Sequence, residues 1–132
     1  LEVADKINEK RLSIWNCYWD GLEKLSDEGK IIRPTIPEGC VHNAHMFYLK
    51  ARDLEERTAL ISYLKEQGVQ AVFHYIPLHT APAGRRYGMF AGEDRYTTRE
   101  SERLVRLPLY YNLSLEQADY VIDKVNAFYK ER

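Results

Sequence analysis

The chain has 132 residues, of which 45% are hydrophobic and 30% are charged, and its formal net charge is −1 at pH 7. This length suits a single domain with its own core, and the composition excludes a disordered chain. The balanced charge excludes general attraction to nucleic acid or to an anionic membrane.

The sequence also indicates a compartment. Cys17 and Cys40 are the only cysteines, which favours two reduced thiols over a disulfide framework. No apolar run approaches the roughly 20 residues of a membrane span, and no signal segment opens the chain. We therefore expect a cytoplasmic protein that does not cross a membrane.

Residues 1–30 are predicted to form an amphipathic helix that ends between Ser26 and Gly29. Its apolar stripe, at helical spacing, consists of Val3, Ile7, Ile14, Tyr18, Leu22 and Leu25. No capping residue precedes Leu1, so we expect a longer protein. In that protein this helix would lead from a larger domain into residues 31–132.

A connector with two prolines follows, and residues 45–51 are predicted to form a strand. Asp53 and Glu56 resemble a capping box, and Gly68 is placed to end the helix that they open. Residues 69–75 alternate as a second strand, which places Phe73 and Tyr75 on the side opposite His74.

Residues 78–96 are expected to form a long loop, and long ordered loops tend to be functional. Thr97 with Glu100 predicts a capped short helix, and residues 106–110 predict a third strand, which Pro108 assigns to an edge. Ser114 with Gln117 opens the last helix, whose buried face is predicted to be Ala118, Val121, Ile122, Val125 and Phe128. The expected fold is α/β, a three-stranded sheet covered by helices.

The densest polar cluster is HYIPLH, residues 74–79, at the end of the second predicted strand. Ligands often bind at the carboxyl ends of strands in α/β sheets. His74 and His79 could donate hydrogen bonds to a polar ligand or carry a proton. The alternative is that both satisfy backbone groups in the turn.

A metal site is a second possibility for the histidines. Cys40, His42 and His45 form C-x-H-x-x-H, and His74 and His79 could complete a ligand set. Structural zinc sites usually use paired ligands at tighter spacings, so the sequence favours no metal.

Several arginines flank the long loop and could grip a phosphate. They are Arg85, Arg86, Arg95, Arg99, Arg103 and Arg106. Acidic residues are interleaved with them, which favours a solvated mixed-charge surface for most. Thr97 and Thr98, at the start of a helix, could also bind an anion through backbone N–H groups.

Three segments carry a resemblance to a known family: NAHMFYLKARD from Asn43, VFHYIPLHTAPAG from Val72, and EDRYTTRESERLVRLPLYYNLS from Glu93. In this order they resemble the C-terminal region of the DegT/DnrJ/EryC1/StrS family of sugar aminotransferases. The resemblance covers nearly the whole chain. It implies the small C-terminal domain of a fold-type-I aminotransferase, in which residues 31–132 form the domain and residues 1–30 connect to it.

The resemblance also implies a reaction. The complete enzyme would transfer an amino group from glutamate to the 4-keto carbon of a dTDP-4-keto-6-deoxy sugar, with pyridoxal 5′-phosphate as electron sink. The cofactor would be bound by an upstream domain, because the eight lysines of this chain lie outside any Schiff-base motif. The enzyme would be a cytoplasmic homodimer.

What the resemblance implies for this chain is limited to substrate contacts. His74, Tyr75 and His79, with Asn43 and Arg95 as further candidates, would shape the sugar-nucleotide end of the pocket. None of them would be catalytic. The competing interpretations are a stand-alone sugar-nucleotide-binding module and a dimerisation module, each without catalysis.

Overall fold

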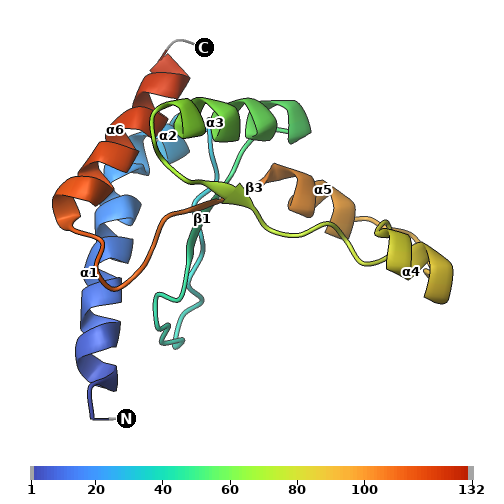
Figure 1. Ribbon diagram of the computed structural model, residues 1–132, viewed down its shortest axis with the longest axis horizontal. Coiled ribbons are helices and arrows are strands. Elements are labelled where there is room, and N and C mark those ends of the chain that lie inside the picture. Colours follow the sequence, from blue (N-terminus) through green and yellow to red (C-terminus); the bar gives the residue numbers. More distant parts are fainter. Residues whose placement is uncertain (1, 131–132) are drawn as a thin grey trace.

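The chain folds around a small antiparallel sheet, seen in a computed structural model that describes residues 2–130. Figure 1 shows the helices gathered around this sheet, with one arm extending away from the body. In chain order the elements are α1 (Ala4–Gly21), α2 (Glu23–Asp27), β1 (Phe47–Lys50), α3 (Leu54–Glu66), β2 (Val72–Phe73), α4 (Pro82–Tyr87), α5 (Thr97–Arg103), β3 (Leu104–Leu107) and α6 (Leu115–Lys130).

The sheet has the order β1-β3-β2, and both pairings are antiparallel. The strand predicted at 106–110 is therefore the central strand β3, and its prediction as an edge is wrong. Pro108 lies just after β3 ends at Leu107, so its missing N–H costs the sheet no hydrogen bond. The expected three-stranded sheet with helices is confirmed.

Helices α1 and α6 lie side by side against the sheet (Figure 1). The predicted N-terminal stripe is buried in its second half, at Ile14, Tyr18, Leu22 and Leu25, whereas the side chain of Val3 is 58% exposed. All five residues of the predicted α6 face are buried. Together with β1 and β3 these side chains form one hydrophobic core.

Two of the three predicted helix caps are found. The Asp53 side chain accepts a hydrogen bond from the backbone N–H of Glu56 at 2.9 Å. Ser114 and Gln117 form a reciprocal box, in which each side chain accepts from the backbone N–H of the other at 3.1 and 3.0 Å.

The cap predicted at Thr97 is wrong, because Thr97 is already the first residue of α5 and the preceding residue makes no side-chain cap bond. Asp94 takes the capping role instead. Its carboxylate accepts from the backbone N–H of Thr98 at 3.3 Å.

The second strand is shorter than predicted, because only Val72 and Phe73 pair with β3. Val69 and Ala71 are buried, whereas Phe73 is 48% exposed and Tyr75 is 73% exposed. Burial on this side of the strand therefore already falls at Phe73, the last residue of β2, and is lost at Tyr75. No helix in the described part of the chain has the length and apolar character required to cross a membrane.

Beyond β2 the chain forms the arm, residues 76–96, which ends at α4 and returns to α5 (Figure 1). The prediction of an unbroken loop over 78–96 is wrong in that it contains α4. This helix folds back closely on the preceding turn, since a Cβ at Gly84 would lie 1.7 Å from the carbonyl oxygen of Leu78. Only glycine fits at this close approach.

Candidate functional site

The sheet has one face in the core and one face turned away from it. Phe47, Leu49, Val105 and Leu107 alternate along β1 and β3 into the core. The alternate residues of β1 and β3, together with the β2 residue that pairs with Arg106, lie on the opposite side of the sheet. We call this side the open face: Tyr48, Lys50, Val72, Leu104 and Arg106. Because the sheet is antiparallel, the carboxyl ends of its strands do not all meet at one edge. The ligand site expected at such an edge therefore has no counterpart in this sheet.

His74 lies beside the open face. Its Nδ1 is 3.4 Å from Nη1 of Arg106. A guanidinium can only donate, so the imidazole nitrogen accepts this bond and His74 is neutral, with its proton on Nε2. Burial lowers the pKa of His74 below its usual value, and the positive charges of Arg106 and His45 lower it further.

Tyr75 marks the turn from β2 into the arm. Its backbone has a φ of +60°, a left-handed conformation that is uncommon for a side chain of this size. The Tyr75 carbonyl accepts a hydrogen bond from the hydroxyl of Ser101 at 2.7 Å. The ring is exposed, and its centroid lies 4.6 Å from that of His74.

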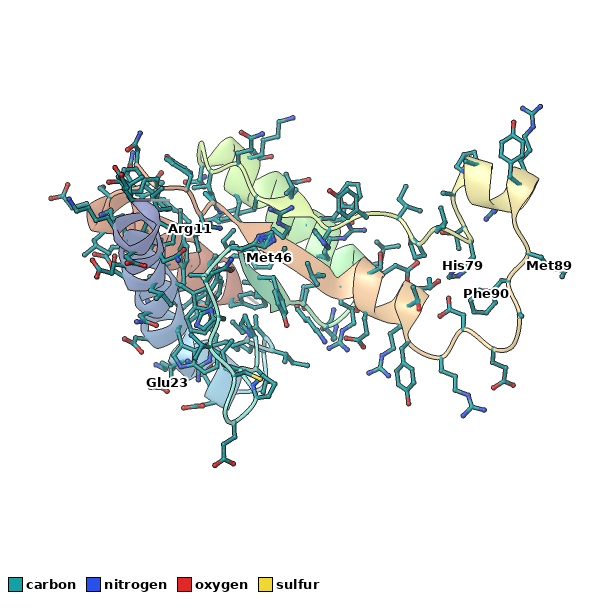
Figure 2. The ribbon with its side chains drawn as sticks, turned by 90° about the horizontal axis from the view of Figure 1, so that it is seen from below. Arg11, Glu23, Met46, His79, Met89 and Phe90 are labelled. Carbon is teal, nitrogen blue, oxygen red and sulfur yellow. The ribbon has the colours of Figure 1, made fainter. Side chains whose placement is uncertain are left out.

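His79 lies on the arm, and Figure 2 places it with Met89 and Phe90, away from Arg11 and Glu23 on α1 and α2. Its Nε2 lies 2.8 Å from Oδ2 of Asp94 and 3.3 Å from the hydroxyl of Thr98. The hydroxyl of Thr98 also donates to Asp94, and this bond is the largest cause that holds the pKa of Asp94 below its usual value.

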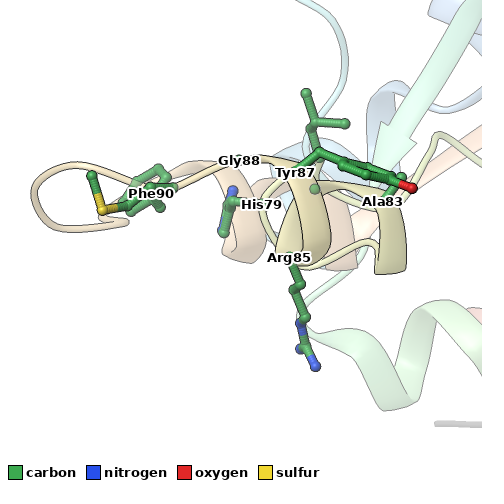
Figure 3. Close-up of a pocket in the computed structure, with 9 residues that line it drawn as sticks. His79, Ala83, Arg85, Tyr87, Gly88 and Phe90 are labelled. Atoms are coloured by element: carbon green, nitrogen blue, oxygen red, sulfur yellow. The ribbon is translucent and has the colours of Figure 1, made fainter.

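A cavity of about 550 Å³ opens beside His79. Figure 3 shows the imidazole between Phe90 and α4, whereas the guanidinium of Arg85 points away from both. The ring centroids of His79 and Phe90 are 4.4 Å apart. The cavity wall is mainly apolar and is formed by Leu78, His79, Ala83, Gly84, Arg85, Tyr87, Gly88, Met89 and Phe90.

Asn43 and Arg95 lie apart from the two histidines. The side chain of Asn43 accepts from the backbone N–H of His45 at 3.1 Å, which stabilises the turn before β1. Arg95 forms an exposed ion pair with Glu93 at 2.9 Å. Within residues 2–130 neither makes a hydrogen bond, ion pair or ring contact with His74 or His79.

The histidines and cysteines considered for a metal are spread over several environments. Cys40 is exposed, and the His42 ring packs edge-on against Trp15 at 4.5 Å. No group of three or more His, Cys, Asp or Glu side chains in the described residues is arranged to hold a metal ion.

The described residues do not fit pyridoxal phosphate either. None of the lysines among the described residues is buried, so none has the desolvated setting that activates a lysine for Schiff-base formation. Lys50, the lysine on the open face, is held by Glu100 at 2.7 Å. No step involving this cofactor is therefore assigned to residues of this chain.

Two residues of the site were not singled out by sequence reasoning. Arg106 stood among several loop-flanking arginines, and only the strand register places it beside His74. Asp94 was one of several interleaved acidic residues. Its spacing of four residues from Thr98 was the available signal for a cap.

A scan against protein families matches residues 1–126 to the DegT/DnrJ/EryC1/StrS aminotransferase family. The chain therefore belongs to this family, as its three characteristic segments suggested.

Two curated relatives are 29% identical to the chain. One is the pleiotropic regulatory protein of Geobacillus stearothermophilus, matched over 96% of this chain and 33% of the relative. The other is dTDP-3-amino-3,6-dideoxy-α-D-galactopyranose transaminase of Aneurinibacillus thermoaerophilus, matched over 97% and 33%. The chain thus spans about a third of the length of these relatives.

Among solved structures, NtdA from Bacillus subtilis with bound cofactor PMP is 30% identical, with a TM-score of 0.77. The match covers 93% of this chain and 28% of that one. The fold described above is therefore also found within a larger protein that binds the cofactor PMP.

Proposed function

We propose that this chain is the small C-terminal domain of a pyridoxal-phosphate-dependent sugar-nucleotide aminotransferase. The observation that carries the proposal is the family match across residues 1–126. The three-stranded sheet with its helices, and the PMP-bound relative of similar fold, support it. In this proposal residues 1–30 form the helix that leads into the domain formed by residues 31–132.

The complete enzyme transfers an amino group from glutamate to the 4-keto carbon of a dTDP-4-keto-6-deoxy-hexose. Its product is dTDP-4-amino-4,6-dideoxygalactose, a precursor for enterobacterial common antigen or lipopolysaccharide. The motifs in residues 72–84 and 93–114 support this choice of substrate. The transaminase relative, by its name, forms a 3-amino sugar, so the experiment below determines which carbon receives the amino group.

Within the enzyme this chain contacts the sugar nucleotide and supplies no catalytic group. His74, Tyr75 and His79, with Asn43 and Arg95, shape that side of the pocket. The cofactor is bound by another part of the protein, because the lysines described above fit no such site.

The enzyme is a cytoplasmic homodimer. Large apolar side chains on the arm support burial against another part of the assembly, since Leu78 is 76% and Met89 94% exposed.

The alternative is a binding or dimerisation module without catalysis. It is supported by one relative whose name describes a regulatory protein and not an enzyme. One experiment separates the two. The protein at its full natural length is loaded with pyridoxal phosphate and mixed with glutamate and dTDP-4-keto-6-deoxyglucose. The proposal predicts a dTDP-4-amino sugar, identified by mass spectrometry and NMR. Binding of the nucleotide sugar with no amino transfer would support the alternative, and a 3-amino product from the matching 3-keto sugar would correct the substrate.

A further inference from the structure

The open face gathers side chains with hydrogen-bond donors from β1, from β3 and from the residue after β2 at one level of the sheet. The register places Tyr48 of β1 and Val72 of β2 on either side of Arg106 in β3. His74 follows Val72 by two residues and contacts Arg106. The guanidinium of Arg106 therefore contacts the imidazole of His74, and the side chain of Tyr48 leaves the same face of the sheet from the strand beside Arg106.

Arg106 differs from its neighbours in having no acidic partner. Arg99 and Arg103 both pair with Glu100, at 3.6 and 3.4 Å. Lys50 also pairs with Glu100. In the described part of the chain no carboxylate lies within ion-pair distance of Arg106. Its guanidinium donates a hydrogen bond to the neutral ring of His74 instead. A half-buried guanidinium in this state retains N–H donors with no partner of opposite charge.

The charges that act on the His74 ring are positive, like the charge of Arg106. Burial is the largest cause that lowers the pKa of His74, and Arg106 and His45 lower it further by disfavouring the charged form of the ring. An anion bound here would reverse that effect and would complete the pairing of Arg106.

We propose that Arg106 and His74, assisted by the hydroxyl of Tyr48, form a binding site for an oxyanion on the open face of the sheet. The guanidinium supplies charge and paired donors, for which planar oxyanions and phosphates are well matched. The neutral imidazole adds an N–H donor without adding a second fixed charge.

The source of the oxyanion rests on the proposed function. A phosphate would come from the diphosphate of the nucleotide sugar, and a carboxylate would come from glutamate. Binding of the oxyanion itself does not depend on amino transfer, so the site is tested without the reaction.

The experiment follows the His74 ring signals by NMR in the 132-residue chain. Inorganic phosphate and glutarate are added separately, with sodium chloride at equal ionic strength as reference. We expect a saturable shift of the His74 signals with at least one of the two anions and a rise in the pKa of His74. The proposed function predicts that phosphate binds more tightly, whereas tighter binding of glutarate would support the anion site and contradict the assignment of His74 to the sugar nucleotide.

Arg106→Gln is expected to weaken this binding about tenfold or more, since a charge-assisted hydrogen bond is lost. Arg99→Gln, which removes an exposed arginine paired with Glu100, is the matched control and should leave the binding unchanged. If Arg106→Gln does not fold, Tyr48→Phe tests the same site by removing only a hydroxyl, and should also weaken binding. Shifts no larger than those with chloride, or equal weakening by Arg99→Gln, would overturn the proposal.

Discussion

The imidazole Nε2 of His79 lies 2.8 Å from the carboxylate Oδ2 of Asp94. This contact joins the start of the arm to its end, because His79 follows β2 and Asp94 precedes α5. The hydroxyl of Thr98, in the first turn of α5, contacts both partners. The three side chains therefore close the arm into a loop around the cavity.

Asp94→Asn should loosen the arm without unfolding the core. The substitution removes the charge that holds His79 and weakens the cap on α5. Amide hydrogen exchange over residues 80–97 should become faster, while exchange in α1 and α6 stays the same. Glu93→Gln is the control, because it removes a neighbouring carboxylate whose ion pair with Arg95 is exposed. This variant should leave exchange unchanged both in the arm and in α1 and α6. Equal acceleration by both variants would argue against a specific contact.

Acid should open the same contact. The pKa of Asp94 is lowered, mainly by the hydrogen bond from the Thr98 hydroxyl, so the carboxylate stabilises the folded arm at pH values above its usual pKa of 3.8. That contribution is lost as the pH falls through the lowered pKa of the folded state. Hydrogen exchange in the arm, corrected for its intrinsic dependence on pH, should therefore accelerate in wild-type protein at this low pH. In Asp94→Asn it should not.

Ser114→Ala should destabilise the chain by about 1 kcal/mol, because the side chain caps α6. Thr97→Ala is the matched comparison. Thr97 stands in a similar sequence pattern but makes no cap bond, so its removal should change the free energy of unfolding by less than about 0.5 kcal/mol. Urea denaturation of both variants measures the difference, and equal losses would show that the sequence pattern rather than the observed geometry governs capping here.

The hydroxyl of Tyr129 lies 3.0 Å from Oε1 of Glu56, a carboxylate that is only 7% exposed. Tyr129→Phe should therefore cost about 1–3 kcal/mol, since a buried carboxylate loses a hydrogen-bond donor. Tyr120→Phe removes an exposed hydroxyl that donates to the Gln67 carbonyl, and should cost less than about 0.5 kcal/mol. A Tyr129→Phe protein as stable as the wild type would show that Glu56 is satisfied by its other partners.

Local signals in the sequence predicted α3 and α6 well, but they missed α4 and gave a single helix where the structure has α1 and α2. The periodicity of α6 identified its buried face, and Asp53 and Ser114 marked true helix starts. Gly68 has a φ of +75°, as expected of a residue that ends a helix. Each of these features depends on residues within one or two helical turns, so the sequence contains the whole signal.

The sheet and the site depended on contacts between distant residues. The alternation placed Phe73 and Tyr75 on one side of a strand through residue 75, but pairing with β3 ends at Phe73. Pro108 indicated an edge because the sequence does not say where the strand ends. The pairing of Arg106 with His74, and of Asp94 with His79, follows from strand register and from the return of the arm. Neither is encoded by local spacing.

In the proposed function, this chain contacts the sugar nucleotide and takes no part in the chemistry on the cofactor. The most direct measurement compares the two half-reactions of His74→Asn in the protein at its full natural length, with His42→Asn as control. His42 packs on Trp15. We predict that His74→Asn lowers kcat/KM for the dTDP-4-keto sugar about five- to 150-fold, chiefly through KM, since one polar contact is worth roughly 1–3 kcal/mol. The half-reaction with glutamate should be unchanged, and His42→Asn should leave both intact. A folded His74→Asn protein that loses the glutamate half-reaction would show that this chain does take part in the chemistry on the cofactor.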